Sequence, residues 1–225
     1  MKKFGFTLAE ILITLGIIGV IAAIAMPALF SNIEKATLEK QTLKFYNRLT
    51  TAFSNYKADN ESPTITNIGF NSDNFVRDYF NAERCSTIAD CFSDTYSFIN
   101  PSKNNLSINF TSTFSDGNYT AYKLSDGTVF LIEGYDEEES YPLTIYFDVN
   151  GQKGPNRVGR DFWSVSVFYD GSLDESGALP EYKKGTQQQI NTINGAIESR
   201  FQECLTSVYG GCFGHFMRNG FKFDY

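Results

Sequence analysis

The sequence contains few of the residue types on which most metalloenzymes and redox proteins depend. Among its 225 residues there is one histidine, His215, and there are four cysteines, none of which forms a C-x-x-C pair. This scarcity excludes His-rich metal sites, zinc ribbons and thioredoxin-like redox motifs, and it leaves little for histidine-based catalysis. We therefore expect a protein that is not an enzyme.

Positive charge is also in short supply. The chain has 19 Lys and Arg against 26 Asp and Glu, which gives a formal net charge of -7. Proteins that bind nucleic acid draw their affinity from clustered cations, so we expect no nucleic-acid partner. The hydrophobic content of 42% is enough for a sizeable core in one or two domains.

One segment lacks charge altogether. Residues 11–30 read ILITLGIIGVIAAIAMPALF, and as a helix this run is roughly 30 Å long, the thickness of a bilayer core. It is longer than the apolar part of a secretory signal peptide, so we predict one membrane-spanning helix. Glu10 lies at the edge of the run, where a carboxylate is costly unless it finds a partner. A plain signal anchor with an interfacial glutamate is the alternative.

The residues around this glutamate form a motif. The string KKFGFTLAE at residues 2–10 resembles the leader of the type IV prepilin and type II secretion pseudopilin family. The resemblance implies that a prepilin peptidase cuts between Gly5 and Phe6, that Phe6 becomes N-methylated, and that Glu10 is needed for assembly. Pro27 falls where the family carries a helix-loosening proline.

Physical chemistry agrees with these implied roles. Cleavage would create a free amine on Phe6, and the amine of a neighbouring subunit is a suitable partner for the Glu10 carboxylate among packed apolar helices. Pro27 lacks an N–H group, so the helix can kink or loosen there. A tolerated transmembrane proline is the other interpretation.

The resemblance also implies a location and a set of partners. The chain would sit in the bacterial inner membrane with a single pass and an extracytoplasmic head, and would then enter a filament. Its partners would be other pilin or pseudopilin subunits, the prepilin peptidase and an inner-membrane assembly platform.

Hydrophobic periodicity continues the helix beyond the membrane segment. Apolar residues recur at three- and four-residue steps from about residue 31 to residue 60, which predicts an amphipathic stripe packed on a head. We expect a leader at 1–5, a transmembrane and assembly helix at 6–30, an amphipathic helix at 31–60 and a globular head at 61–225. The fold class is α+β and pilin-like, with the long N-terminal helix on an antiparallel sheet and a C-terminal helical extension.

The head is predicted to contain short strands and two further helices. Ser125-Asp126-Gly127 between two of the strands is typical of a hairpin turn. The expected strands are 106–110, 119–124, 128–132, 142–149, 162–169 and a terminal strand at 219–225, and the expected helices are 74–81 and 186–208.

The most ligand-like segment runs from Asp148 to Asp161. Oxygen-bearing side chains at Asp148, Asn150 and Asp161, with glycines between them, suit a hard cation such as Ca²⁺. The segment is similar to the glycine-rich loop that binds calcium in major pseudopilins, but it lacks the spacing of an EF-hand. A plain Asn-Gly loop between two strands is the alternative.

The four cysteines are predicted to form disulfides. Proximity in sequence favours the pairs Cys85–Cys91 and Cys204–Cys212, and the extracytoplasmic head implied by the resemblance makes disulfides reasonable. Four cysteines allow three connectivities, and the sequence leaves crossed pairs open.

Three functions are compatible with a membrane-anchored head. The first is a structural subunit of a type II secretion pseudopilus or type IV pilus-like filament. The second is a minor pilin of a DNA-uptake or adhesive pilus, and finding Lys153, Arg157 and Arg160 together on an exposed face with aromatic residues would support it. The third, an anchored enzyme, requires a cleft with converging titratable groups.

Overall fold

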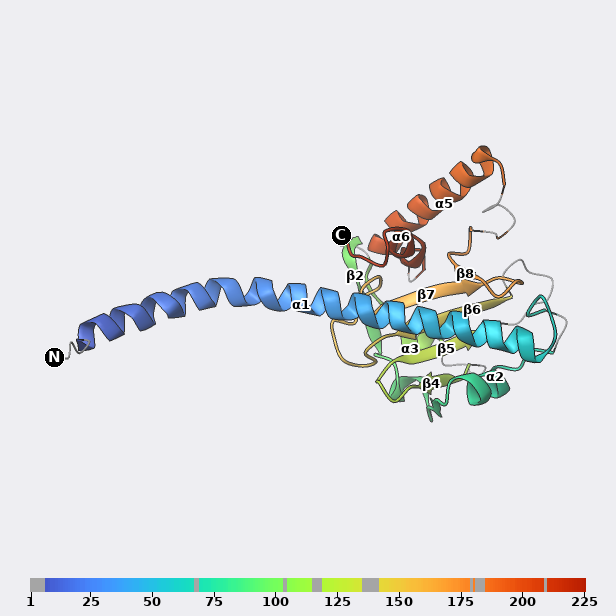
Figure 1. Cartoon of the computed structure of the whole chain (residues 1–225), viewed down its shortest axis with the longest axis horizontal. Helices are drawn as coiled ribbons and strands as arrows, with labels where there is room; N and C mark the ends of the chain where they lie inside the picture. Colours follow the sequence, from blue (N-terminus) through green and yellow to red (C-terminus); the bar gives the residue numbers. More distant parts are fainter. Residues whose placement is uncertain are drawn as a thin grey trace, which may run out of the picture. The chain divides into compact units, whose positions relative to one another are not determined.

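The computed structural model describes residues 7–66, 69–102, 105–114, 119–134, 142–178, 180, 185–208 and 210–225. It has an α+β, pilin-like architecture in which a long N-terminal helix precedes an antiparallel sheet, and further helices follow the sheet (Figure 1). The elements in chain order are α1 (Leu8–Asp59), α2 (Ser72–Tyr79), β1 (Glu83–Arg84), η1 (Ile88–Asp90), β2 (Thr95–Ser102), β3 (Asn105–Asn109), α3 (Phe110–Thr113), β4 (Ala121–Lys123), β5 (Val129–Glu133), β6 (Leu143–Asp148), β7 (Phe162–Val167), β8 (Leu173–Asp174), α5 (Gln187–Thr206) and α6 (Cys212–Arg218).

The chain divides into two compact units, residues 1–37 and residues 38–225, and α1 contributes to both. Within the second unit, α1 buries one stripe of side chains. Their spacing of three and four residues places them on one face of a helix, as the sequence predicts. Phe45 is central to this stripe because its ring lies 5.5 Å from the ring of Phe130 and 4.7 Å from that of Phe147. The buried apolar residues of α1 are Leu38, Phe45, Leu49, Ala52, Phe53 and Tyr56.

The main sheet has six strands in the order β1-β4-β5-β6-β7-β8, and all its pairings are antiparallel. Its middle strands are buried on both faces. One face packs on α1, and the other packs on β2 and α3, where Phe162 meets Tyr96 at 4.3 Å and Tyr146 meets Phe110 at 6.0 Å. β2 and β3 form a separate antiparallel pair. The core therefore lies in two layers, one on each side of the sheet.

The C-terminal helices pack against the outer part of the sheet. The indole of Trp163 on β7 lies 4.6 Å from the ring of Phe216 on α6. A disulfide between Cys204 on α5 and Cys212 on α6 joins the two helices. The C-terminal helical extension predicted from the sequence is therefore present, and Gly195 does not interrupt α5.

Most predicted strands coincide with observed ones. The segments 119–124, 128–132, 142–149 and 162–169 correspond to β4, β5, β6 and β7, and the predicted hairpin joins β4 to β5 with Gly127 at a φ of +92°. The segment 106–110 corresponds to β3, although Phe110 already begins α3.

The terminal strand predicted at residues 219–225 is wrong. This tail has no strand partner in the part of the chain that the structure describes. The N–H groups of residues 219–221 donate to backbone carbonyls of α6, and side chains contact the backbone further along the tail. The N–H of Phe223 donates to Glu39 on α1 at 2.9 Å, and the guanidinium of Arg160 donates to the carbonyl of Tyr225. The alternating aromatic residues pack as a cluster around Trp163 and Phe216, which a period-2 pattern alone does not distinguish from a strand.

Candidate functional site

The N-terminal end of α1 contains a capping box built from Thr7 and Glu10. The backbone N–H and the hydroxyl of Thr7 donate to Oε2 of Glu10 at 2.8 and 2.7 Å, and the N–H of Glu10 donates back to Oγ1 of Thr7 at 3.3 Å. This arrangement satisfies N–H groups that an α-helix otherwise leaves without partners. In a single chain the Glu10 carboxylate therefore already has hydrogen-bond donors. Gly5 and Phe6, the predicted cleavage and methylation residues, lie outside the described residues.

The first unit of the chain exposes an almost continuous apolar surface. α1 is the only described helix that is long and apolar enough to cross a membrane by length and composition, and no residue of its most apolar window is buried. At Gly16 and Gly19 an added Cβ would meet no atom within 4 Å. The exposed large apolar residues of this segment are Leu8, Ile11, Leu12, Ile13, Leu15, Ile17, Ile18, Val20, Ile21, Ile24, Met26, Leu29, Phe30 and Ile33.

Pro27 lies inside α1, which continues on both sides of it. Because proline has no N–H, the carbonyl of Ala23 loses its usual helical donor. The helix is therefore weaker at this point, although it is not interrupted.

The loop from Asp148 to Asp161 is held by its own carboxylates. Oδ2 and Oδ1 of Asp161 accept the N–H groups of Asn156 and Arg157, each at 2.7 Å. Oδ1 of Asp148 accepts the N–H of Asn150 at 2.9 Å, and its Oδ2 accepts the hydroxyl of Tyr96 at 2.9 Å. All four carboxylate oxygens are thus used to fold the loop.

Burial alters the ionisation of both carboxyl groups. Loss of water raises the pKa of Asp161 to about 6, against the lowering effect of its backbone hydrogen bonds. Burial, together with the charge of Asp161, raises the pKa of Asp148 well above its usual value.

The calcium site predicted at Asp148, Asn150 and Asp161 stays a prediction. Ca²⁺ requires six to eight oxygen ligands. The carboxylate oxygens here accept hydrogen bonds from the loop, the side-chain amide of Asn150 donates to the carbonyl of Gly154 at 3.0 Å, and Oδ1 of Asn150 is buried with no hydrogen-bond partner among the described residues. Among the described residues, no group of three or more His, Cys, Asp or Glu side chains could hold a metal ion. The loop connects β6 to β7, and its own carboxylates hold its backbone.

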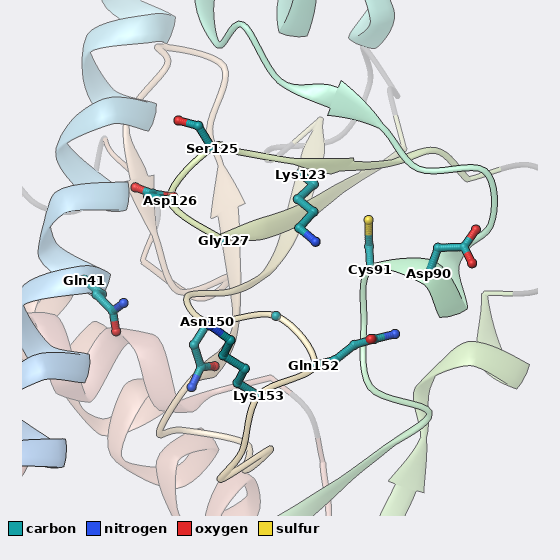
Figure 2. Close-up of a pocket in the computed structure, with 11 residues that line it drawn as sticks. Gln41, Asp90, Cys91, Lys123, Ser125, Asp126, Gly127, Asn150, Gln152 and Lys153 are labelled. Atoms are coloured by element: carbon teal, nitrogen blue, oxygen red, sulfur yellow. The ribbon is translucent and has the colours of Figure 1, made fainter.

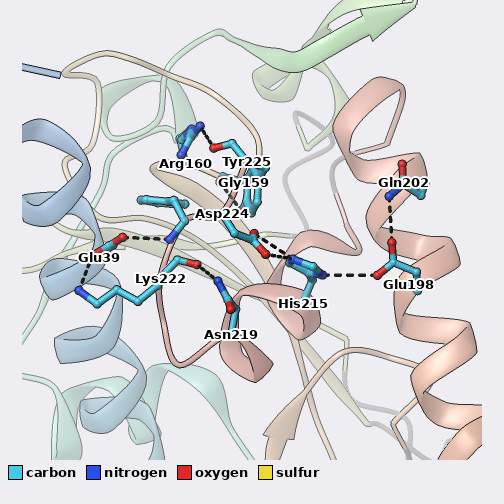
Figure 3. A network of polar contacts seen from close by, with 11 residues as sticks. Glu39, Gly159, Arg160, Glu198, Gln202, His215, Asn219, Lys222, Asp224 and Tyr225 are labelled. Atoms are coloured by element: carbon cyan, nitrogen blue, oxygen red, sulfur yellow. Dashed lines mark hydrogen bonds and ion pairs between the residues drawn. The ribbon is translucent and has the colours of Figure 1, made fainter. Parts of the chain in front are cut away.

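The structure contains the disulfides Cys85–Cys91 and Cys204–Cys212. The described residues contain no free cysteine. There is therefore no thiol near His215 that the imidazole could activate as a nucleophile. Its ring stacks on Phe201 with 3.7 Å between ring centroids. Its two nitrogens face carboxylates, at 3.0 Å from Asp224 and 3.5 Å from Glu198 (Figure 3). His215 therefore helps to hold the C-terminal tail against α5.

Of the three basic residues expected on a DNA-binding face, Arg160 contacts the C-terminal tail. Arg160 lies over the rings of Phe223 and Tyr225, at 4.5 and 5.0 Å from their centroids, and contacts the end of the chain (Figure 3). Lys153 and Arg157 are exposed. The aromatic residues around Arg160 are thus engaged in packing the tail.

Two comparisons with known proteins give a match. Residues 1–26 match the family model described as the prokaryotic N-terminal methylation motif. Over 71 residues the chain is 41% identical to the type II secretion system core protein G of Escherichia coli (strain K12), and the match covers 32% of this chain and 48% of that protein. The chain thus spans about half the length of this curated relative. No solved structure matches the chain.

Proposed function

We propose that this chain, which carries the N-terminal segment of the type IV prepilin and pseudopilin family, is a structural subunit of a type II secretion pseudopilus or a similar filament. Its work would be polymerisation in support of protein secretion, with no chemical step of its own. A prepilin peptidase would remove residues 1–5 and leave an N-methylated Phe6. An inner-membrane platform would then transfer the helix from the bilayer to the filament.

The exposed apolar face of α1 carries this proposal. Large apolar side chains from Leu8 to Ile33 are exposed in the single chain. A bilayer can cover them before assembly, and equivalent helices of other copies can cover them afterwards. Removal of such surface from water is worth about 25 cal/mol per Å², so the segment needs a cover in both states. Because lipid tails are as apolar as these side chains, close packing of the helices and polar contacts would drive the transfer from bilayer to filament.

Glu10 would set the axial register between subunits. In the single chain its carboxylate accepts two hydrogen bonds from Thr7. An amine on Phe6 of a neighbouring copy would add an opposite charge in an apolar surrounding, where one well-placed pair selects one register among many.

Substitution of Glu10 tests the proposal. Glu10→Ala should leave membrane insertion and leader cleavage intact and lower the sheared filament fraction at least about tenfold, since removal of a buried partner costs about 3 kcal/mol. Glu10→Gln separates charge from capping because its amide oxygen can still accept from Thr7. We expect it to keep the helix start and to lose filaments to a similar degree.

Immunoblots of sheared and membrane fractions provide the measurement. Normal filament yield from both variants would remove the electrostatic part of the proposal. A wild-type chain that is inserted and cleaved but never enters a filament would overturn the proposed function itself.

A further inference from the structure

The head contains a polar pocket of about 480 Å³, which lies entirely within the second unit of the chain. It is bordered by the β4–β5 turn, by the start of the loop after β6 and by the segment around Cys91 (Figure 2). Gln41 on α1 forms part of a further side. The described lining contains no large apolar side chain, so the pocket suits a hydrophilic ligand and not a lipid tail or an aromatic ring.

The walls of this pocket are tied to one another. The side-chain amide of Gln152 donates to a backbone carbonyl inside the loop that the Cys85–Cys91 disulfide closes. The segment after β6 also approaches the β4–β5 turn so closely that a Cβ on Gly151 would lie 3.1 Å from the carbonyl oxygen of Gly127. The lining is therefore held in place before a ligand arrives, which lowers the entropic cost of binding.

Two lysines of the pocket lack an anionic partner within the described part of the chain. Lys123 comes from β4 and Lys153 from the loop after β6, and both are exposed. Neither side chain forms a hydrogen bond or ion pair with another described residue. In Figure 2 the Lys123 ammonium points toward the turn that contains Gln152. The pocket therefore has cationic groups available for an external anion.

The carboxylates of the pocket are engaged, and they limit the charge of a ligand. Asp126 pairs with Lys44 at 2.5 Å, and Asp90 accepts the N–H of Thr87 at 2.8 Å. Lys44 and the two unpaired lysines make three positive charges against two aspartates, which leaves a local charge of +1. A monoanion such as a carboxylate therefore fits better than a phosphate dianion or a polyanion.

The pocket also offers uncharged groups that can bind hydroxyls. Ser125 and the side-chain amide of Gln41 line it together with the lysines. Asn150 lines it as well, and its Oδ1 atom is buried with no hydrogen-bond partner among the residues that the structure describes. A buried acceptor without a donor is unfavourable, and a hydroxyl group of a ligand can supply that donor. This combination of cations and neutral hydrogen-bonding groups suits a carboxylate that carries several hydroxyls.

We infer that the pocket between Lys123 and Lys153 binds a sugar acid, which is a sugar ring with one carboxylate, as in a uronate unit. The two lysines hold the carboxylate, and Gln41, Ser125 and Asn150 bind the hydroxyl groups. The inference goes beyond the proposed function, because binding needs the head and not the filament. Contacts with exposed lysines are individually weak, so the dissociation constant for a single sugar should lie in the millimolar range.

Titration of the full-length chain in a non-ionic detergent tests the inference. D-glucuronate is the probe, and ligand-observed nuclear magnetic resonance measures its dissociation constant. D-glucose has a similar ring without the charge, and acetate has the charge without the ring. We expect glucuronate to bind at least about tenfold more tightly than either, because glucuronate alone uses both the lysines and the neutral groups.

Substitution of the lysines assigns the binding to this pocket. Lys123→Gln and Lys153→Gln should each raise the dissociation constant about two- to fivefold, which is the range for one exposed charge pair, and the double variant should raise it about tenfold. Lys153→Arg keeps the charge and should stay within about twofold of the wild type. Arg77→Gln is the matched control, because Arg77 is an exposed cation on α2 that pairs with Asp78 and does not line the pocket. We expect it to leave the dissociation constant unchanged.

Each outcome decides for or against the site. Preferential binding of glucuronate that is weakened in the double variant and kept in Arg77→Gln supports it. Equal affinity for acetate would mean a general contact with anions, and equal affinity for glucose would mean that the lysines are not used, so either result overturns the inference. Absence of saturation in the wild type, or an unchanged dissociation constant in a double variant whose near-ultraviolet circular dichroism shows a folded head, overturns it as well. None of these results bears on filament formation, so the two proposals fail separately.

Discussion

At the scale of single residues, two arginine–aspartate pairs of this head differ mainly in burial. Arg218 makes a bidentate contact with Asp174, from Nη1 to Oδ1 at 2.8 Å and from Nη2 to Oδ2 at 3.1 Å. The Asp174 side chain is only 1% exposed. Arg77 contacts Asp78 in a similar way, but these side chains are 68% and 50% exposed. The pairs therefore allow a direct comparison of a buried and an exposed charge.

We predict that Arg218→Met destabilises the head and that Arg77→Met does not. Loss of Arg218 removes a bidentate cation from a buried carboxylate, which should lower the free energy of unfolding by about 3 kcal/mol. Loss of Arg77 should change it by less than about 0.5 kcal/mol. Urea unfolding of the detergent-solubilised chain, followed by near-ultraviolet circular dichroism, measures both. Equal effects of the two substitutions would contradict a dominant role for burial.

Residue patterns predicted some contacts and missed others for identifiable reasons. The disulfide pairs and the Gly127 turn involve short sequence separations, so local patterns favoured them, although crossed cysteine pairs stayed open until the structure showed the connectivity. The partners of Glu39 lie 183 and 184 residues away, on Lys222 and Phe223. No periodicity encodes such a long-range contact. The Thr7 cap of Glu10 does have a local signal, because T-x-x-E is the signature of a capping box.

At the scale of elements, hydrophobic periodicity correctly predicted the helices that are both long and packed on one side. α1 and α5 were expected close to their observed bounds. β1 and β8 have two residues each and are too short to show any period. The loop 148–161 has the composition of a cation site, but composition does not reveal that its carboxylates fold onto neighbouring N–H groups.

The same loop predicts a pH dependence of stability. The pKa of Asp161 is about 6 in the folded head and about 4 in an unfolded chain. The folded state thus holds the proton more tightly, so this stabilisation is complete below pH about 4 and is lost as the pH rises through about 6. The expected loss is about 3 kcal/mol.

Asp161→Asn should remove this contribution. The variant loses one acceptor for the N–H groups of Asn156 and Arg157, which costs about 1 kcal/mol. Its unfolding free energy should nevertheless fall less steeply than that of the wild type between about pH 4 and pH 7. Asp148 remains in both proteins, so the difference between their two curves, measured by urea unfolding at each pH, reports mainly on Asp161. Parallel curves would show that folding does not raise the pKa of Asp161.

At the scale of the whole molecule, two units of different chemistry share one helix. The second unit has its own buried core, from Leu38 on α1 to Phe216 on α6. The first unit exposes its apolar side chains. The solubility and the assembly of the whole chain should therefore depend on residues of the first unit, which contribute nothing to the folding of the head.

We predict that a fragment of residues 31–225 is a soluble, folded monomer. The head core should keep its cooperative transition because its apolar partners all lie within residues 38–225. The full chain should require detergent, since each exposed large apolar side chain gains about 1.5–3 kcal/mol on full burial and many of them line the segment. Gel filtration and thermal unfolding of the fragment, beside the full chain in detergent, measure both properties. A fragment that aggregates or unfolds without cooperativity would mean that the head needs the apolar helix for its own stability, and the separation of anchoring from folding would be lost.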